Sequence, residues 1–214
     1  MASSAAAARR KRAVESFSNA AETIGPLERG MALFAVTRGQ WSMIDAILYV
    51  CDALGPGAQV SVWTWTIADY EVQAFQGLMW RKDLAGASLV VDMSADKRNR
   101  PLLNQWRAQF GDDAVRVCRS HAKIARVWAG EWRFLLRGSM NLNHNPRFEQ
   151  FDLTEGGDDF DLVRQIEEEM PILRSDYTFA DVAAATKLNR AFDEATLQQF
   201  GALESLVNIR VKRI

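Results

Sequence analysis

The stretch HAKIARVWAGEWRFLLRGSMN, residues 121–141, decides how this chain arranges its most reactive side chains. Residues 121–128 alternate polar and apolar side chains, as a half-buried β-strand does. An Ala-Gly-Glu sequence can then turn the chain, and residues 132–136 are the return strand of the predicted hairpin. Because residues two apart on a strand point to the same face, we expect His121 and Lys123 to project side by side.

Upstream of this hairpin, strand and helix patterns alternate. The expected order is strand, helix, strand, helix, strand, helix and strand, over residues 31–36, 43–54, 59–66, 68–84, 88–92, 100–110 and 115–118. Such alternation is typical of a largely parallel sheet with helices on both faces. The sequence therefore predicts an α/β fold.

The chain divides into three expected parts. Residues 1–28 are predicted to be a basic arm, helical or disordered, and residues 29–176 to be the main domain. Residues 177–214 are predicted to be a C-terminal helix followed by a basic tail. Within the main domain, residues 155–170 hold seven acidic side chains against one basic side chain, so we expect most of that stretch to be an exposed helix face.

Composition gives only broad limits. The chain has 214 residues, of which 48% are hydrophobic and 25% are charged, as in an ordinary soluble globular protein. A net charge of -1 gives no overall attraction to nucleic acid, so any such binding requires a local patch. We see neither a signal peptide nor an apolar run that could span a membrane, and we expect a cytoplasmic protein. Cys51 and Cys118 are expected to be buried, unbridged thiols.

A second short sequence, GSMN at residues 138–141, follows the hairpin at once. Its glycine lets backbone approach a ligand closely, while Ser139 and Asn141 add neutral hydrogen-bond donors. His121 can act as a nucleophile or as an acid and base, and Lys123 beside it supplies positive charge. A cation, an amide and a hydroxyl that converge on one point suit an oxyanion such as phosphate.

Each of these sequences alone has an ordinary structural explanation. His-x-Lys on a strand is commonplace, and Gly-Ser-x-Asn is a frequent turn; their order, separated by one hairpin, favours a functional role. Further along, Glu149 could hold one imidazole nitrogen and leave the other to react. The two histidines and two cysteines are too scattered to form a ligand cluster, so we expect neither a metal nor another cofactor.

Together, His121-x-Lys123 and Gly138-Ser139-x-Asn141 resemble the HKD signature of the phospholipase D superfamily. The resemblance extends over roughly residues 30–170. It implies an α/β/α sandwich built on a mostly parallel mixed sheet.

The resemblance also implies a role for each matched side chain. His121 matches the nucleophile that forms a covalent phosphohistidine. Lys123 and Asn141 match the groups that hold the nonbridging phosphate oxygens, and Ser139 matches a supporting hydroxyl. Glu149 is a looser match to the acid that orients the histidine.

Two features depart from the family pattern. Trp128 stands where the motif usually has an aspartate, and the hairpin before Gly138 is longer than the common one. The aspartate is not the attacking group, so its replacement leaves the mechanism possible, although it bears on full activity.

A single motif implies two subunits. Catalysis in this family needs two facing histidines, one to attack phosphorus and one to protonate the leaving oxygen. His144 is no second copy, because no lysine follows it at the right place, and it is predicted to be a loop residue. The resemblance therefore implies a homodimer in which His121 of each subunit meets at one shared site.

The expected function is that of a metal-independent phosphodiesterase, with a nuclease as the first hypothesis and nucleic acid as the partner. The alternative is a phospholipase D-like accessory protein that binds nucleic acid with weak or no catalysis. Lipid hydrolysis is a third hypothesis, disfavoured because the chain has no second motif and no obvious amphipathic membrane stretch. We expect no membrane partner.

Four side chains are candidates for substrate binding: Arg38, Thr66, Arg137 and Arg147. Arg38 and Thr66 follow predicted strands, where ligands bind in open α/β sheets, although helix capping or simple exposure explains them equally well. Arg137 and Arg147 flank the GSMN sequence. They could contact a nucleic-acid backbone or form ion pairs with the acidic stretch.

Overall fold

The computed structural model describes residues 10–16, 18–64, 76–78, 80–81, 84–118, 120–142 and 145–176, without the side chains of residues 10–11 and 93–98. Apart from Asp176, these residues belong to one compact unit, Met1–Ser175. The predicted C-terminal helix and tail belong to a second unit, Asp176–Ile214, and lie outside the described residues. Residues 1–9 of the predicted arm and residues 68–75 of one predicted helix also lie outside them.

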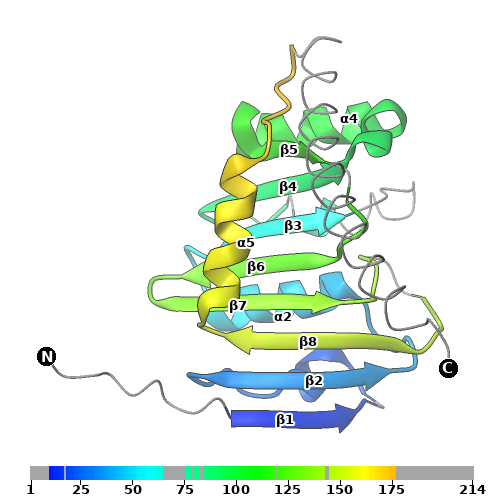
Figure 1. Ribbon diagram of the computed structural model, residues 1–214, viewed down its shortest axis with the longest axis vertical. Helices are drawn as coiled ribbons and strands as arrows, with labels where there is room; N and C mark the ends of the chain where they lie inside the picture. The colour runs from blue at the N-terminus through cyan, green and yellow to red at the C-terminus, as the bar shows by residue number, and fades with distance from the viewer. Residues whose placement is uncertain are drawn as a thin grey trace, which may run out of the picture. The chain divides into compact units, whose positions relative to one another are not determined.

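Eight strands of the described chain form one sheet, in the order β1-β2-β8-β7-β6-β3-β4-β5 (Figure 1). They are β1 Arg10–Glu15, β2 Met31–Thr37, β3 Gln59–Thr64, β4 Gly86–Asp92, β5 Val115–Cys118, β6 Ile124–Ala129, β7 Trp132–Gly138 and β8 Glu149–Glu155. Three pairings are parallel: β1 with β2, β3 with β4, and β4 with β5. Four pairings are antiparallel: β2 with β8, β8 with β7, β7 with β6, and β6 with β3. The sheet is therefore mixed and not mostly parallel, because the β6–β7 hairpin and β8 occupy its middle.

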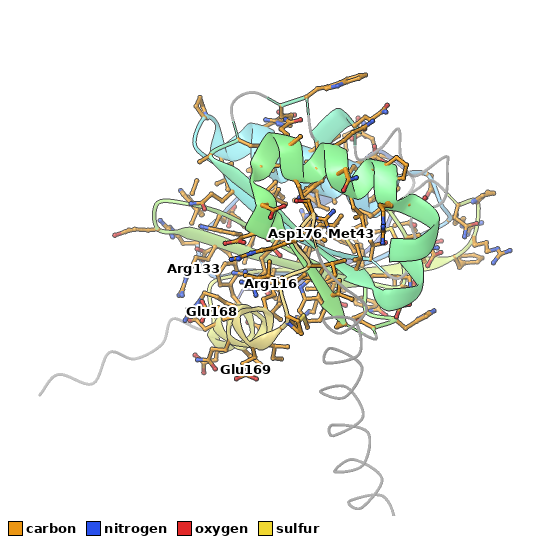
Figure 2. All side chains as sticks on the ribbon, turned by 90° about the horizontal axis from the view of Figure 1, so that it is seen from above. Met43, Arg116, Arg133, Glu168, Glu169 and Asp176 are labelled. Carbon is orange, nitrogen blue, oxygen red and sulfur yellow. The ribbon has the colours of Figure 1, made fainter. Side chains whose placement is uncertain are left out.

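Helices cover both faces of this sheet, as predicted for an α/β fold. The described helices are α1 Ala20–Ile24, α2 Met43–Leu54, α4 Met93–Phe110 and α5 Asp158–Glu169, with a 3-10 turn at Asp112–Ala114. Helix α2 packs on β6, α4 on β4 and α5 on β7. Figure 1 draws α5 in front of the sheet and α2 behind it, and Figure 2 shows α4 and α5 on opposite sides.

The N-terminal segment differs from the predicted helical or disordered arm. Residues 10–15 form β1, which pairs in parallel with β2 at the edge of the sheet. The Arg12 guanidinium donates to the carbonyls of Thr23 and Ile24 at 2.6 and 2.5 Å, at the C-terminal end of α1. A cation is favourable there because the last carbonyls of a helix carry negative partial charge. The strand depends on its pairing with β2, which the Ala- and Arg-rich local sequence does not signal.

Most acidic side chains of the 155–170 stretch are at least partly exposed, as predicted, but Glu155 is buried and so is Glu167. The Glu167 Oε1 accepts the Ser61 hydroxyl at 2.8 Å and the Trp63 indole N–H at 2.6 Å. The buried Arg126 guanidinium pairs with the same carboxylate. This network fixes α5 to β3 and β6, because a buried charge is stable only when it is paired and hydrogen-bonded.

Both cysteines are buried and neither forms a disulfide, which confirms that prediction. Burial raises the pKa of the Cys118 thiol to about 12, and the nearby Asp92 carboxylate adds to the rise against a hydrogen bond with Ser120. In the described part of the chain, no helix is both long and apolar enough to cross a lipid bilayer. Within the same residues, no three His, Cys, Asp or Glu side chains gather in a way that suits a metal ion.

Candidate functional site

The two halves of the motif lie at one end of the sheet. Strands β2 and β7 end there at Thr37 and Gly138, and β6 and β8 begin there at Ile124 and Glu149. Ile124 pairs with Arg137, and Glu149 pairs with Thr37, so the register places these strand ends next to one another. We call this end of the sheet, on the right in Figure 1, the motif rim.

His121 and Lys123 lie just before β6 rather than on it, since the strand begins at Ile124. Two hydrogen bonds fix this segment: Ser120 N–H donates to the Asp92 carboxylate at 3.2 Å, and Ala122 N–H donates to the Ser120 hydroxyl at 3.0 Å. The strand therefore begins three residues later than predicted, at Ile124.

The imidazole and the ammonium nevertheless meet. The Lys123 Nζ lies 3.5 Å from the His121 Nδ1 and donates to the His121 carbonyl at 3.2 Å. An ammonium group only donates hydrogen bonds, so this contact suits a neutral ring that carries its proton on Nε2. His121 is exposed at the motif rim.

Gly138 joins the two halves of the motif through the backbone. Its N–H donates to the Lys123 carbonyl at 3.3 Å. A Cβ at this position would lie 2.2 Å from the Gln150 carbonyl oxygen, so only glycine fits against β8. The glycine accommodates the neighbouring strand, whereas the sequence suggested an approach to a ligand.

Ser139 binds the start of β8. Its hydroxyl donates to the Glu149 carboxylate and accepts the Gln150 N–H at 3.0 Å. Its own N–H donates to the Gln150 carbonyl at 3.0 Å. Among the described residues Glu149 hydrogen-bonds Ser139 and not His121, so the acid acts on the serine in this arrangement.

Asn141 is held by its backbone. Its carbonyl accepts the N–H of Met43, the first residue of α2, at 3.2 Å. Its half-buried side-chain amide makes no hydrogen bond to the other described residues, which leaves its N–H groups for a ligand. Buried Met140 and Leu142 on either side hold this segment in place.

The predicted substrate-binding residues have different surroundings. Arg137 pairs with Asp159 of α5 at 3.1 Å. This is the predicted ion pair with the acidic stretch, the alternative to contact with a nucleic-acid backbone. Arg38 pairs with Glu15 at 2.9 Å on the surface. The Arg147 side chain is exposed and has no partner within the described part of the chain. Thr66 and His144 lie outside the described residues.

Trp128, at the position of the family aspartate, lies away from the motif rim. It is four residues along β6 from Ile124, a rise of about 13 Å, and it pairs with Gln59 at the opposite end of β3. Its ring packs edge-on against Phe160 of α5, with ring centroids 6.2 Å apart. The replacement therefore changes the packing beneath α5 and not the surroundings of His121.

Sequence reasoning missed Phe148, which stands immediately before β8 with 68% of its surface exposed. The Arg38 guanidinium lies 5.2 Å from the centre of its ring. A single aromatic residue in a loop carries no periodic signal. Only the pairing of β8 with β2 shows that it lies beside Arg38.

Comparisons with known proteins leave the family open. No protein-family model matches the chain, and no curated protein does. Polyphosphate kinase from Porphyromonas gingivalis aligns with a TM-score of 0.46 and 16% identity, over 65% of this chain and 26% of the kinase. Phosphatidylserine synthase from Haemophilus influenzae Rd KW20 aligns with a TM-score of 0.46 and 13% identity, over 78% of this chain and 46% of the synthase.

A third solved structure is TrmBL2, an archaeal chromatin protein described as showing a novel mode of DNA binding. It aligns with a TM-score of 0.41 and 10% identity, over 69% of this chain and 55% of that protein. The chain thus spans between 26% and 55% of the length of these three proteins. Similarity at this level decides neither family nor activity.

Proposed function

We propose that this protein is a metal-independent phosphodiesterase of the phospholipase D type, that it cleaves nucleic acid, and that it works as a homodimer. The observation that supports the proposal most is the hydrogen bond from Gly138 N–H to the Lys123 carbonyl at 3.3 Å. It brings His-x-Lys and Gly-Ser-x-Asn, which are separated by a hairpin in the sequence, together at one rim.

The first step is attack on phosphorus by His121. Its Nε2 forms a bond to phosphorus, the bond to the leaving oxygen breaks, and the leaving oxygen takes a proton from the second subunit's imidazole. The Lys123 ammonium and the Asn141 amide stabilise the charge on the nonbridging oxygens. In the second step, that imidazole removes a proton from water, the water oxygen bonds to phosphorus, and the phosphorus–nitrogen bond breaks.

Lys123 has to move for the first step to begin. Attack through Nε2 requires the neutral ring to carry its proton on Nδ1, whereas an ammonium beside Nδ1 favours the opposite tautomer. The 3.5 Å contact between Lys123 and His121 is therefore a resting arrangement. A bound phosphate attracts the ammonium away from the ring, which allows the reactive tautomer to form.

The need for a second subunit follows from the number of histidines. The sequence contains two, and His144 lacks a following lysine at motif spacing. His121 is exposed at the rim, where an equivalent residue of a second copy can approach it. A two-fold axis beside the rim would supply the acid that the leaving oxygen requires.

The proposal is tested by cleavage of end-labelled single- and double-stranded DNA with EDTA present. Wild type should cut, and His121→Ala should lose at least about a thousandfold in rate with an unchanged melting temperature, because nucleophile and acid are lost together. Gln165→Ala, on the exposed surface of α5, is the matched control and should cut like wild type. Equal cleavage by His121→Ala would overturn the mechanism.

Mixing subunits tests the dimer in the same assay. Light scattering should give twice the chain mass. Excess His121→Ala subunits added to wild type should suppress cleavage, because hybrid dimers lack one of the two imidazoles. A monomer that cuts DNA at the full rate would exclude the shared site.

The second candidate is a binding protein with weak or no catalysis. It is favoured by the hydrogen bond between Glu149 and Ser139, which occupies the acid expected to orient the imidazole. Nucleic-acid binding by wild type without any cleavage would support this candidate over the first.

A further inference from the structure

A compact surface of three residues lies along the motif rim, next to the motif itself. It consists of Arg38, Arg147 and Phe148, and we call it the Phe148 platform. The ring of Phe148 is 68% exposed, and the Arg38 guanidinium lies 5.2 Å from its centre. Arg147, the preceding residue, is exposed as well. An open aromatic face beside two cations suits a ligand with both π surfaces and negative charges.

The loops that carry the platform are locked together. A Cβ on Gly39, whose φ is +79°, would lie 1.9 Å from the Asn145 carbonyl oxygen, so the two loops touch at the backbone. Arg147 N–H donates to the same carbonyl at 2.8 Å. Arg38 N–H donates to the Gln40 side-chain oxygen at 2.7 Å. A loop backbone held this way loses little conformational freedom when a ligand binds.

The platform lies within reach of a polymer bound at the motif. Strand β8 begins immediately after Phe148, and β7 alone separates it from β6, which begins immediately after Lys123. Two strand spacings amount to about 10 Å. A polynucleotide whose phosphate sits at His121 can cover that distance within a few nucleotides.

The surroundings of the ring favour a base over an apolar protein partner. An isolated exposed aromatic residue is ordinary, and a protein interface requires a contiguous apolar patch. Arg147 and Glu149 flank Phe148 in the chain, and Arg38, which pairs with Glu15, lies over its ring. The Arg38–Glu15 pair is a surface ion pair, worth little in water, so a phosphate can replace the carboxylate.

We infer that Phe148 stacks on an unpaired base of a single-stranded nucleic acid while Arg38 and Arg147 contact its phosphates. The inference rests on the proposed function and names its substrate class. Single strands are favoured because the bases of a duplex already stack on their neighbours, whereas an unpaired base offers an open face. The platform would hold the strand beside the scissile phosphodiester.

Binding of three probes by the 214-residue chain carrying His121→Ala, with EDTA present, tests the inference. The probes are a labelled oligothymidylate, the same length of strand with abasic sites, and a duplex of equal length. Phe148→Ala should weaken oligothymidylate binding about five- to tenfold, because stacking contributes to affinity base by base. The abasic strand should bind equally well with and without Phe148, since it retains the phosphates and lacks the bases.

Two further variants complete the design. Phe148→Trp should restore oligothymidylate binding, because it supplies another stacking face. Leu162→Ala removes a side chain on α5 that is 55% exposed, and it should bind like the parent. Unchanged oligothymidylate binding by Phe148→Ala would overturn the inference, and so would an equal loss for abasic and thymidine strands.

Failure of the platform and failure of the proposed function give different results. If wild type cuts no DNA, but Phe148→Ala weakens binding of oligothymidylate and not of the abasic strand, the platform stands and the catalytic proposal falls. If wild type cuts single strands and Phe148→Ala changes neither KM nor binding, the catalytic proposal stands and the platform falls.

Discussion

The motif rim and the underside of α5 both concentrate charged side chains, but they do so in opposite ways. Under α5, the Glu167 carboxylate is buried and accepts hydrogen bonds from Ser61, Trp63 and Arg126. At the rim, His121 is exposed and the Asn141 amide makes no hydrogen bond to other described residues. A buried charge is tolerated only with its partners, so the loss of one partner is costly, whereas accessible polar groups at a rim are suited to a ligand.

Breaking the network under α5 should have the largest effect on stability. Glu167→Ala leaves the Arg126 guanidinium buried without its counter-ion, which should lower the free energy of unfolding by about 3–5 kcal/mol. The measurement is urea denaturation followed by circular dichroism.

A double variant separates pairing from packing. Arg126→Met with Glu167→Leu removes both charges and keeps apolar volume, so it should recover most of the loss. His121→Ala in the same assay should unfold like wild type. If Glu167→Ala were as stable as wild type, the contrast between the two regions would not hold.

Trp128→Asp tests which of the two regions this position belongs to. Because the ring packs against Phe160 and lies about 13 Å along β6 from the rim, we expect a loss of stability of about 1–3 kcal/mol. We expect no gain in the proposed nuclease activity, although the change places an aspartate where the phospholipase D motif usually has one. Trp128→Phe is the control and should retain most of the stability. A large rise in cleavage rate with Trp128→Asp would show that the position acts on the site.

The smallest expected effect concerns Cys118, which lies under α5 in the same core cluster as Trp63 and Phe160. Its folded pKa of about 12 exceeds the value of 9.0 taken for an unperturbed thiol. Its contribution to stability is therefore complete below pH 9 and is lost as the pH rises toward 12, where the unfolded chain releases the proton more easily.

Urea denaturation between pH 8 and pH 10.5 measures this contribution. Wild type should lose more stability over that range than Cys118→Ala, which has no thiol to titrate. The native protein should also resist thiol reagents at pH 8 and react once it is unfolded, because both cysteines are buried. If the free energy of unfolding of wild type and Cys118→Ala had the same pH dependence, the elevated pKa of Cys118 would be contradicted.

The α/β class and several helix boundaries could be predicted because their signals are local. Residues 43–54 were predicted as a helix from apolar spacing, and α2 has those bounds, with Ser42 and Asp45 at its start and Gly55 after its end. The β6–β7 hairpin was also predicted from alternation and a turn. Strand β1 could not be predicted, since its pairing partner lies in another part of the sequence.

The candidate site shows the same difference between what local sequence predicts and what long-range pairing sets. The sequence by itself determined which reactive groups are present and that two short motifs stand in a fixed order, because these are properties of neighbouring residues. Only the tertiary structure decided that Glu149 binds Ser139, that Arg137 pairs with Asp159 and that Phe148 lies beside Arg38. These contacts depend on the order and register of β2, β8, β7 and β6, which are set by long-range pairing that no local pattern encodes.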